Sequence, residues 1–125
     1  VKIGLFCSTP MVSLSRIVGK RNALDMLLTG RVVSAKEAKE MGLINKVVKK
    51  DKLDSETENL AKNISKYSGY TLSLGKKAFY HQIELDMISA YDYAKDIISK
   101  NCLSHDAQEG MKAFLEKRKP QWRDK

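Results

Sequence analysis

The sequence has few cysteines, histidines and long apolar runs, and each shortage argues against a class of protein. No apolar run approaches the ~20 residues that a transmembrane helix needs, so we expect no transmembrane helix. Cys7 and Cys102 lack the spacing of a disulfide framework, which predicts free thiols in an intracellular, reducing compartment and leaves a disulfide as the less favoured alternative. With only His81 and His105 as histidines, we also expect no metal site.

The composition is typical of a folded chain with a positive charge. The 125 residues are 42% hydrophobic and 30% charged, with only seven Gly and two Pro, which excludes a disordered or collagen-like chain. The net charge of +8 raises the expectation of an anionic partner and leaves open a phosphate-bearing small molecule, a nucleic acid or a membrane surface. The chain starts at Val1 rather than Met, so we expect it to be a piece of a longer one.

The first thirty residues are predicted to form a strand and two short helices. Apolar residues alternate with other types over positions 1–5, which is the period of a strand. Thr9 is expected to cap a helix that has Pro10 at its first position. Glycine favours a helix end, so one helix should end at Gly19 and a second at Gly30.

A brief helix and a longer one are predicted next. Ser34 and Glu37 form a capping box, in which each side chain accepts a hydrogen bond from a backbone N–H at the start of a helix that Gly42 stops. An extended stretch over residues 43–48 follows. The amphipathic helix after it is expected to be closed by Gly69.

The last part of the chain is predicted to be helical throughout. Apolar residues recur at helical spacing from about Thr71 and again from Met87 to Ile98. Ser104 is expected to cap a final helix that Pro120 ends. The predicted fold class is therefore α+β and mainly helical, with a change of character near residue 69.

The usual catalytic and ligand-binding patterns are absent. Gly19-Lys20 resembles the end of a phosphate-binding loop, but Leu14 replaces the first glycine and Arg21 the Mg²⁺-binding hydroxyl residue. Cys102 and His105 lack the other ligands of a zinc site and the third group of a nucleophilic triad.

Paired carboxylates also lack the setting of an acid and base pair. Glu37 with Glu40, and Glu56 with Glu58, stand among lysines, and we expect solvated side chains with ordinary pKa values. We therefore expect these four glutamates to be surface groups.

The end of the chain carries the strongest local signal. Three consecutive cations, Lys117 to Lys119, lie between the aromatic residues Phe114 and Trp122. Cations can hold a phosphate and aromatic rings can stack on an adenine, which suits a nucleotide-bearing ligand or a nucleic acid. A solvated, frayed terminus explains the same residues equally well.

Several motifs resemble the crotonase superfamily, the enoyl-CoA hydratases and isomerases. They are Leu24–Gly30 (LDMLLTG), Ser34–Ala38 (SAKEA), Gly42–Val48 (GLINKVV) and Glu109–Pro120 (EGMKAFLEKRKP). Their order and spacing span nearly the whole chain. A further segment, Gly4–Pro10 (GLFCSTP), is most similar to a mitochondrial branch of the family.

The resemblance implies a fold and an assembly. Residues 1–68 would be the end of the ββα spiral core, and residues 69–125 the C-terminal helical region through which family members form trimers or hexamers. The family's oxyanion-binding N–H groups and both catalytic glutamates would lie before Val1. We therefore assign no catalytic residue, and neither Glu37 nor Glu109 is given that role.

The resemblance also implies a ligand. Phe114 and Lys117 match the aromatic and the lysine by which hydratases contact the nucleotide of coenzyme A (CoA), and a spacing of three would place both on one helix face. The expected partner is an acyl-CoA or enoyl-CoA thioester, as substrate and without a separate cofactor, in a protein that hydrates or isomerises enoyl-CoA. We expect no membrane partner. The alternatives are a non-catalytic assembly module and, less favoured, a nucleic-acid-binding segment.

Overall fold

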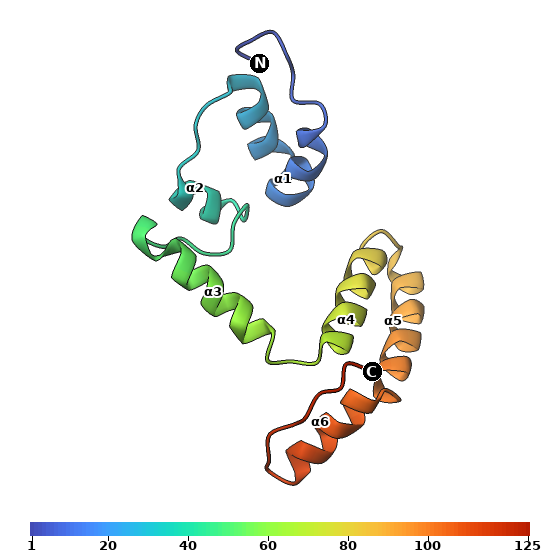
Figure 1. The fold of residues 1–125 in the computed structure, drawn as a ribbon. Coiled ribbons are helices and arrows are strands. Elements are labelled where there is room, and N and C mark those ends of the chain that lie inside the picture. Colours follow the sequence, from blue (N-terminus) through green and yellow to red (C-terminus); the bar gives the residue numbers. More distant parts are fainter. The chain divides into compact units, whose positions relative to one another are not determined.

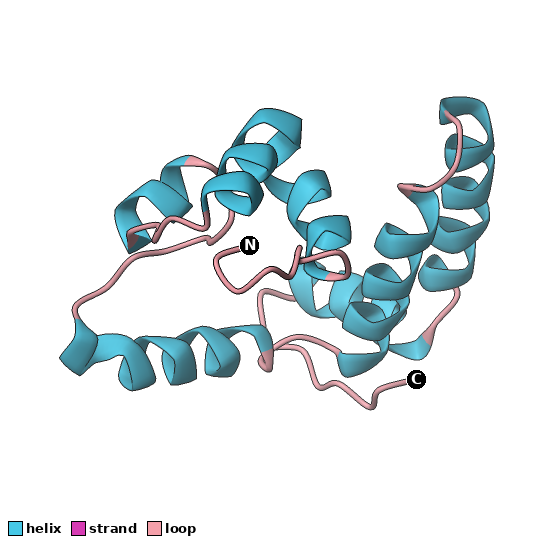
Figure 2. Cartoon of the chain, turned by 90° about the horizontal axis from the view of Figure 1, so that it is seen from above, coloured by secondary structure: helices cyan, strands magenta, loops and turns pink.

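The computed structural model describes all residues from Val1 to Lys125, and its regular structure is entirely helical (Figures 1 and 2). The chain forms two compact units, Val1–Asp54 and Ser55–Lys125. Its elements are α1 (Pro10–Thr29), α2 (Ala35–Glu40), the 3-10 turn η1 (Lys50–Lys52), α3 (Leu53–Ile64), α4 (Gly69–Gln82), α5 (Met87–Cys102) and α6 (His105–Leu115). No helix combines the length and the apolar character needed to span a membrane. The predicted division into the end of a spiral core, residues 1–68, and a C-terminal helical region, residues 69–125, stays a prediction.

The predicted strand over residues 1–5 is wrong. These residues form turns, with Gly4 N–H bonded to the Val1 carbonyl at 3.1 Å, and Ile3 is 83% exposed. Residues 43–48, predicted as an extended stretch, are neither helical nor paired as a strand. A strand is stabilised by a neighbouring strand, and no segment of this chain pairs with either stretch. The mainly helical prediction is confirmed, whereas the β part of the α+β prediction is not observed.

The break predicted at Gly19 is confirmed as a kink within α1. Gly19 has φ 77° and ψ 162°, which interrupts the helix between its two halves. Pro10 occupies the start of α1 as predicted, but the Thr9 side chain makes no capping hydrogen bond. Thr9 already has helical dihedral angles, φ −74° and ψ −44°, and Met11 N–H bonds back to the Cys7 carbonyl, so the chain is turning before Thr9.

The start and end of α2 follow the sequence, with one difference. Ser34 Oγ accepts a hydrogen bond from Glu37 N–H at 3.2 Å, and Gly42, with φ 78°, lies just after the helix. The Glu37 carboxylate does not complete the predicted capping box. It binds the Arg31 guanidinium at 2.6 and 3.1 Å, because a bidentate charged partner is stronger than a single backbone N–H.

In the second unit, Gly69 begins a helix and does not close one. Ser68 Oγ accepts a hydrogen bond from Thr71 N–H at 3.2 Å and so caps α4, which makes Gly69 its first residue. Asp86 caps α5 by accepting from Ile88 and Ser89 N–H. The predicted cap at Ser104 is confirmed, since its hydroxyl accepts from the first turn of α6.

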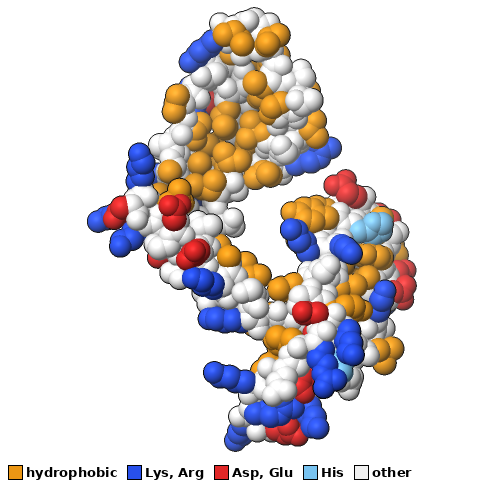
Figure 3. All heavy atoms as spheres, in the orientation of Figure 1, with side chains coloured by type: hydrophobic (Ala, Val, Ile, Leu, Met, Phe, Trp, Pro, Cys, Tyr) orange, Lys and Arg blue, Asp and Glu red, His pale blue; other side chains and the backbone are white.

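The helices of the second unit form a hairpin with a third helix against it. Figures 1 and 2 show α4 and α5 side by side and antiparallel, and α6 contacts both. The buried residues of this unit are small or polar, namely Ser68, Ser104, Asp106 and Ala113. Many large apolar side chains stay exposed, and orange side chains gather over the α4–α5 hairpin in Figure 3. The outer faces of the hairpin are therefore apolar surfaces that no other helix of the second unit covers.

Candidate functional site

The last ten residues, 116–125 (the tail), are fastened onto α6. The Asp106 carboxylate has no exposed surface, and it accepts hydrogen bonds from Arg123 N–H at 2.8 Å and Asp124 N–H at 2.9 Å. Asp106 N–H in turn donates to the Lys125 carbonyl at 3.0 Å. The interpretation of a frayed terminus is therefore wrong.

Asp106 keeps its charge despite its burial. Burial raises the pKa of this carboxyl, but hydrogen bonds from the Ser68 hydroxyl, two tail N–H groups and His105 outweigh that effect and lower the pKa to about 2. The carboxylate is thus ionised at neutral pH, where each backbone donor of the tail meets a charged acceptor. Such bonds are stronger than those between neutral groups, which explains why the tail has a fixed path.

Two further contacts tie the tail to the turn before α4. Trp122 Nε1 donates to the Lys66 carbonyl at 2.7 Å, and Asp124 Oδ1 accepts from Gly69 N–H, also at 2.7 Å. The Trp122 ring passes within 3.3 Å of the position that a Cβ would occupy at Gly110, so the absence of a side chain there lets the ring approach α6. Residues more than fifty positions apart are joined in this way.

The turn that follows α6 places a lysine in a left-handed conformation. α6 ends at Leu115, well before Pro120, which was predicted to end it. Lys117 has φ 54°, its N–H bonds to the Phe114 carbonyl at 3.2 Å, and Arg118 N–H bonds to the Ala113 carbonyl at 3.0 Å. These are the two bonds of a Schellman motif, in which glycine is the usual left-handed residue. A side chain there costs about 1–2 kcal/mol.

An ion pair holds this turn against the helix. The Arg118 guanidinium binds both oxygens of Glu109 on α6, at 2.6 and 2.9 Å, and its Nε binds Glu116 at 2.6 Å. Glu109, whose side chain is 15% exposed, also accepts from Gln121 N–H at 2.8 Å. The hydrogen bonds from Arg118 and then from Gln121 lower the pKa of Glu109 to about 2. We call Glu109, Glu116 and Arg118 the clamp.

The two predicted site residues lie at this end of α6. Phe114 is 81% exposed in the last turn of the helix, and Lys117 is exposed in the turn after it. The expectation that both share one helix face is wrong, because the helix ends between them and the left-handed turn sets the direction of Lys117. Of the three consecutive cations, Arg118 is engaged by carboxylates. In Figure 3, acidic and basic side chains are intermixed in this region.

Glu37 is not the ordinary surface carboxylate that its lysine-rich sequence predicts. The hydrogen bonds from the Arg31 guanidinium hold the pKa of Glu37 below its usual value. Arg31 also binds Asp25 at 2.5 Å and so links the end of α1 to α2. The sequence pattern missed this because the arginine lies before the helix, outside the helical spacing that predicts side-chain pairs.

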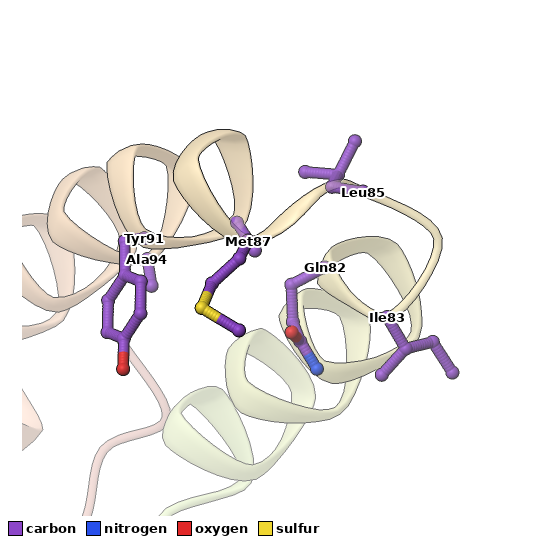
Figure 4. A pocket seen from close by; sticks show the side chains of 7 residues that line it. Gln82, Ile83, Leu85, Met87, Tyr91 and Ala94 are labelled. Carbon is purple, nitrogen blue, oxygen red and sulfur yellow. The ribbon is translucent and has the colours of Figure 1, made fainter.

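An apolar pocket lies where α4 turns into α5. It has a volume of about 660 Å³ and is lined by Gln82, Ile83, Leu85, Met87, Ala90, Tyr91 and Ala94. Figure 4 shows the side chains of Gln82, Met87 and Tyr91 pointing to the same side, with Leu85 turned away. The helical spacing of the sequence predicted that these helices have an apolar side, but the turn that joins them shapes the pocket.

The remaining candidate groups do not assemble into a site. No set of three or more His, Cys, Asp and Glu side chains is placed to hold a metal ion. Cys7 and Cys102 are free thiols, and both are exposed.

Comparison with known families identifies the class of protein. The family model described as enoyl-CoA hydratase/isomerase matches residues 1–125. The chain belongs to this family. The enoyl-CoA hydratase domain-containing protein 3 of Mus musculus, which is named as mitochondrial, is 48% identical to it over 98% of the chain and 41% of the relative. The predicted resemblance to a mitochondrial branch is confirmed.

Solved structures of the family show the same fold. A crystal structure of an enoyl-CoA hydratase from Mycobacterium smegmatis matches with a TM-score of 0.94 and 47% identity, over 97% of this chain and 47% of that one. The human enoyl-CoA hydratase domain-containing protein 3 matches with a TM-score of 0.94 and 45% identity, over 97% of this chain and 48% of that one. The crotonase fold is thereby shown, and the chain spans about two fifths of the length of the mouse relative.

Proposed function

We propose that this chain forms the C-terminal part of a protein that binds acyl-CoA thioesters as substrates, with Phe114 and Lys117 contacting the nucleotide end of CoA. The family match over residues 1–125 supports the ligand class. The observation that carries the site is the end of α6, where an aromatic ring that is 81% exposed lies three residues before a lysine held in a left-handed turn.

The two side chains suit the two chemical groups of a CoA nucleotide. The adenine ring is a flat aromatic surface, and an exposed phenylalanine can stack on it at little conformational cost. The phosphates are anionic, and the ammonium group of a lysine attracts them as a mobile point charge. Burial of the Phe114 ring under an adenine would also remove an apolar side chain from water.

The reaction proposed for the whole protein is the hydration or the isomerisation of an enoyl-CoA. Hydration would require two carboxyl groups as acid and base, whereas isomerisation could proceed with one. Glu37 and Glu109 do not suit these roles, because each is held by an arginine and has a lowered pKa. The proposal therefore gives this chain a binding role and assigns it no catalytic residue.

Binding of CoA to the protein at its full natural length tests the proposal. We expect CoA to raise the melting temperature, and we expect Phe114→Ala and Lys117→Ala each to raise the dissociation constant about five- to tenfold, as loss of one stacking or charged contact predicts. Titration calorimetry measures the constants. Leu115→Ala and Lys112→Ala are matched controls, since they remove an equally exposed apolar side chain and one positive charge from the same helix. Unchanged affinity in both site variants would contradict the assignment.

A second candidate function is assembly without catalysis. The favouring observation is the exposure of large apolar side chains on α5 and just after it, with Met87 76%, Tyr91 67% and Leu103 83% exposed. Such a surface is typical of a subunit interface. We propose a homotrimer, or a hexamer built from trimers, that uses the α4–α5 hairpin. Nucleic-acid binding is less favoured, because Arg118 is engaged in the middle of the basic run.

A further inference from the structure

We infer that Glu109 and Arg118 are positioning residues, which hold Lys117 in the left-handed turn where its ammonium group can meet the phosphates of CoA. This inference rests on the proposed function, because it takes Lys117 as the residue that contacts the ligand. It adds a role for two neighbouring side chains that do not touch the ligand themselves.

The first observation is the identity of the left-handed residue. The Schellman turn after α6 needs a positive φ, which glycine adopts without strain, yet a lysine with φ 54° stands there. A strained backbone position persists when the surrounding contacts fix it, and such positions gather at binding and catalytic sites. The side chain at 117 is therefore the feature that the turn presents.

The second observation is the way in which the clamp encloses Lys117. The residues before and after Lys117 are bonded to each other, since Arg118 Nε donates to Glu116 at 2.6 Å. The two terminal nitrogens of the same guanidinium donate to both oxygens of Glu109, nine positions back on α6. Because both neighbours of Lys117 are fixed, the backbone at 117 has little freedom to leave its left-handed conformation.

The third observation argues against Arg118 itself as a bidentate phosphate ligand. Its Nε binds Glu116, both terminal nitrogens bind Glu109, and one of them also donates to the Lys119 carbonyl at 3.3 Å. Four of its five N–H donors are engaged, so the guanidinium could bind a phosphate through both terminal nitrogens only by breaking its bidentate pair with Glu109. Arg118 therefore acts on the ligand through the position of Lys117.

Substitution of Glu109 distinguishes a role in positioning Lys117 from a direct electrostatic effect of the Glu109 charge on the ligand. Glu109→Met removes a negative charge close to the proposed phosphate site, so electrostatic attraction alone predicts tighter binding of CoA. Positioning predicts the opposite. We expect the dissociation constant for CoA to rise about three- to tenfold when Lys117 is present and to stay unchanged when Lys117 is already alanine, since two residues that act through one contact are not additive.

The experiment is a double-mutant cycle of Glu109→Met and Lys117→Ala in the protein at its full natural length, with CoA as the titrated ligand. Glu109→Gln repeats the cycle with a milder change, because its amide oxygen still accepts from Arg118 and preserves the fold. Glu84→Gln, in the turn between α4 and α5, is the control for the same change in net charge. The melting temperature of each variant separates a loss of stability from a loss of affinity.

Each outcome has one meaning. A rise in the dissociation constant that depends on Lys117 supports the inference. An equal rise in both backgrounds, no rise, or tighter binding overturns it while leaving the proposed function intact, provided that Lys117→Ala alone weakens binding. If Lys117→Ala has no effect, the assignment of Lys117 fails and the inference fails with it.

Discussion

At the scale of single residues, Asp106 and Glu109 are the acceptors on which the path of the tail depends. Asp106 is buried and receives two backbone N–H groups of the tail, and Glu109 receives Arg118 and the backbone of Gln121. Both carboxyl groups have a pKa of about 2 in the folded chain. The tail is therefore held by negative charges that exist only while these groups are ionised.

The lowered pKa values of Asp106 and Glu109 make the stability of the fold depend on pH. Asp106 and Glu109 have ordinary pKa values of 3.8 and 4.5 and folded values of about 2, so each contributes stability that is fully present above the ordinary value. That contribution is lost as the pH falls from about 4.5 to 2. We expect the melting temperature to fall by several degrees over this interval, as measured by circular dichroism.

The control for this prediction is Asp106→Asn. The amide cannot carry the charge that the tail N–H groups meet, so the variant should melt lower than the parent at pH 7 and show a smaller further fall in acid. A melting temperature that is the same at pH 7 and pH 3 in the parent chain would rule out this account of the tail.

At the scale of elements, the ends of the helices are set by local chemistry at some positions and by distant contacts at others. Ser34, Ser104 and Gly42 act as their local sequence predicts, since caps and left-handed glycines need only neighbouring backbone groups. Gly69 differs, because the hydroxyl of Ser68 caps α4 and the carboxylate of Asp124 binds the Gly69 N–H. Glycine thus follows the end of one helix at Gly42 and begins another at Gly69.

Two glycine substitutions of opposite expected sign test this distinction. Gly42 has φ 78°, so Gly42→Ala should lower the free energy of unfolding by about 1 kcal/mol although no atom lies within 4 Å of the added Cβ. Gly75 lies inside α4, also with nothing within 4 Å, and Gly75→Ala should raise it by about 0.5–1 kcal/mol. Denaturant unfolding measures both, and a loss at Gly75 equal to that at Gly42 would refute the conformational explanation.

At the scale of the whole molecule, the chain buries few large apolar side chains. Its buried hydrophobic residues are Val18, Ala23, Ala38 and Ala113, whereas Met87 and Tyr91 on α5 are largely exposed. The side chains of Met87 and Tyr91 line the pocket where α4 turns into α5, as Figure 4 shows. Exposed apolar surface of this kind marks an interface, which agrees with the proposed assembly through the hairpin.

Charge placed on this surface tests the assembly. We expect Met87→Glu and Tyr91→Glu to reduce the oligomer mass of the protein at its full natural length, because a buried carboxylate without a partner is costly in an apolar interface. Light scattering after size exclusion measures the mass. Lys95→Glu, on an exposed and charged part of α5, is the control and should leave it unchanged. A parent protein that is monomeric at all concentrations would contradict the proposal.

The candidate site was only partly predictable from the sequence. The composition of the end of the chain, with Phe114 and Lys117 near each other, was visible as a pattern and as a resemblance to a family. The clamp was not visible, because Glu109 and Arg118 are nine positions apart and meet only after the chain leaves α6 and turns back. The helical spacing that suggested one shared face failed where the helix ended.

The sequence by itself determined which segments are helical and some of their ends, because apolar periodicity and caps such as Ser34 and Ser104 act over a few neighbouring residues. It also determined the family, since several motifs of the family occur in this chain in the family's order. Only the tertiary structure decided that residues 1–5 form turns, that the tail is fastened by Asp106, and that Lys117 is left-handed. These features depend on contacts, or on missing partners, between segments far apart in the sequence, and local patterns do not encode such distances.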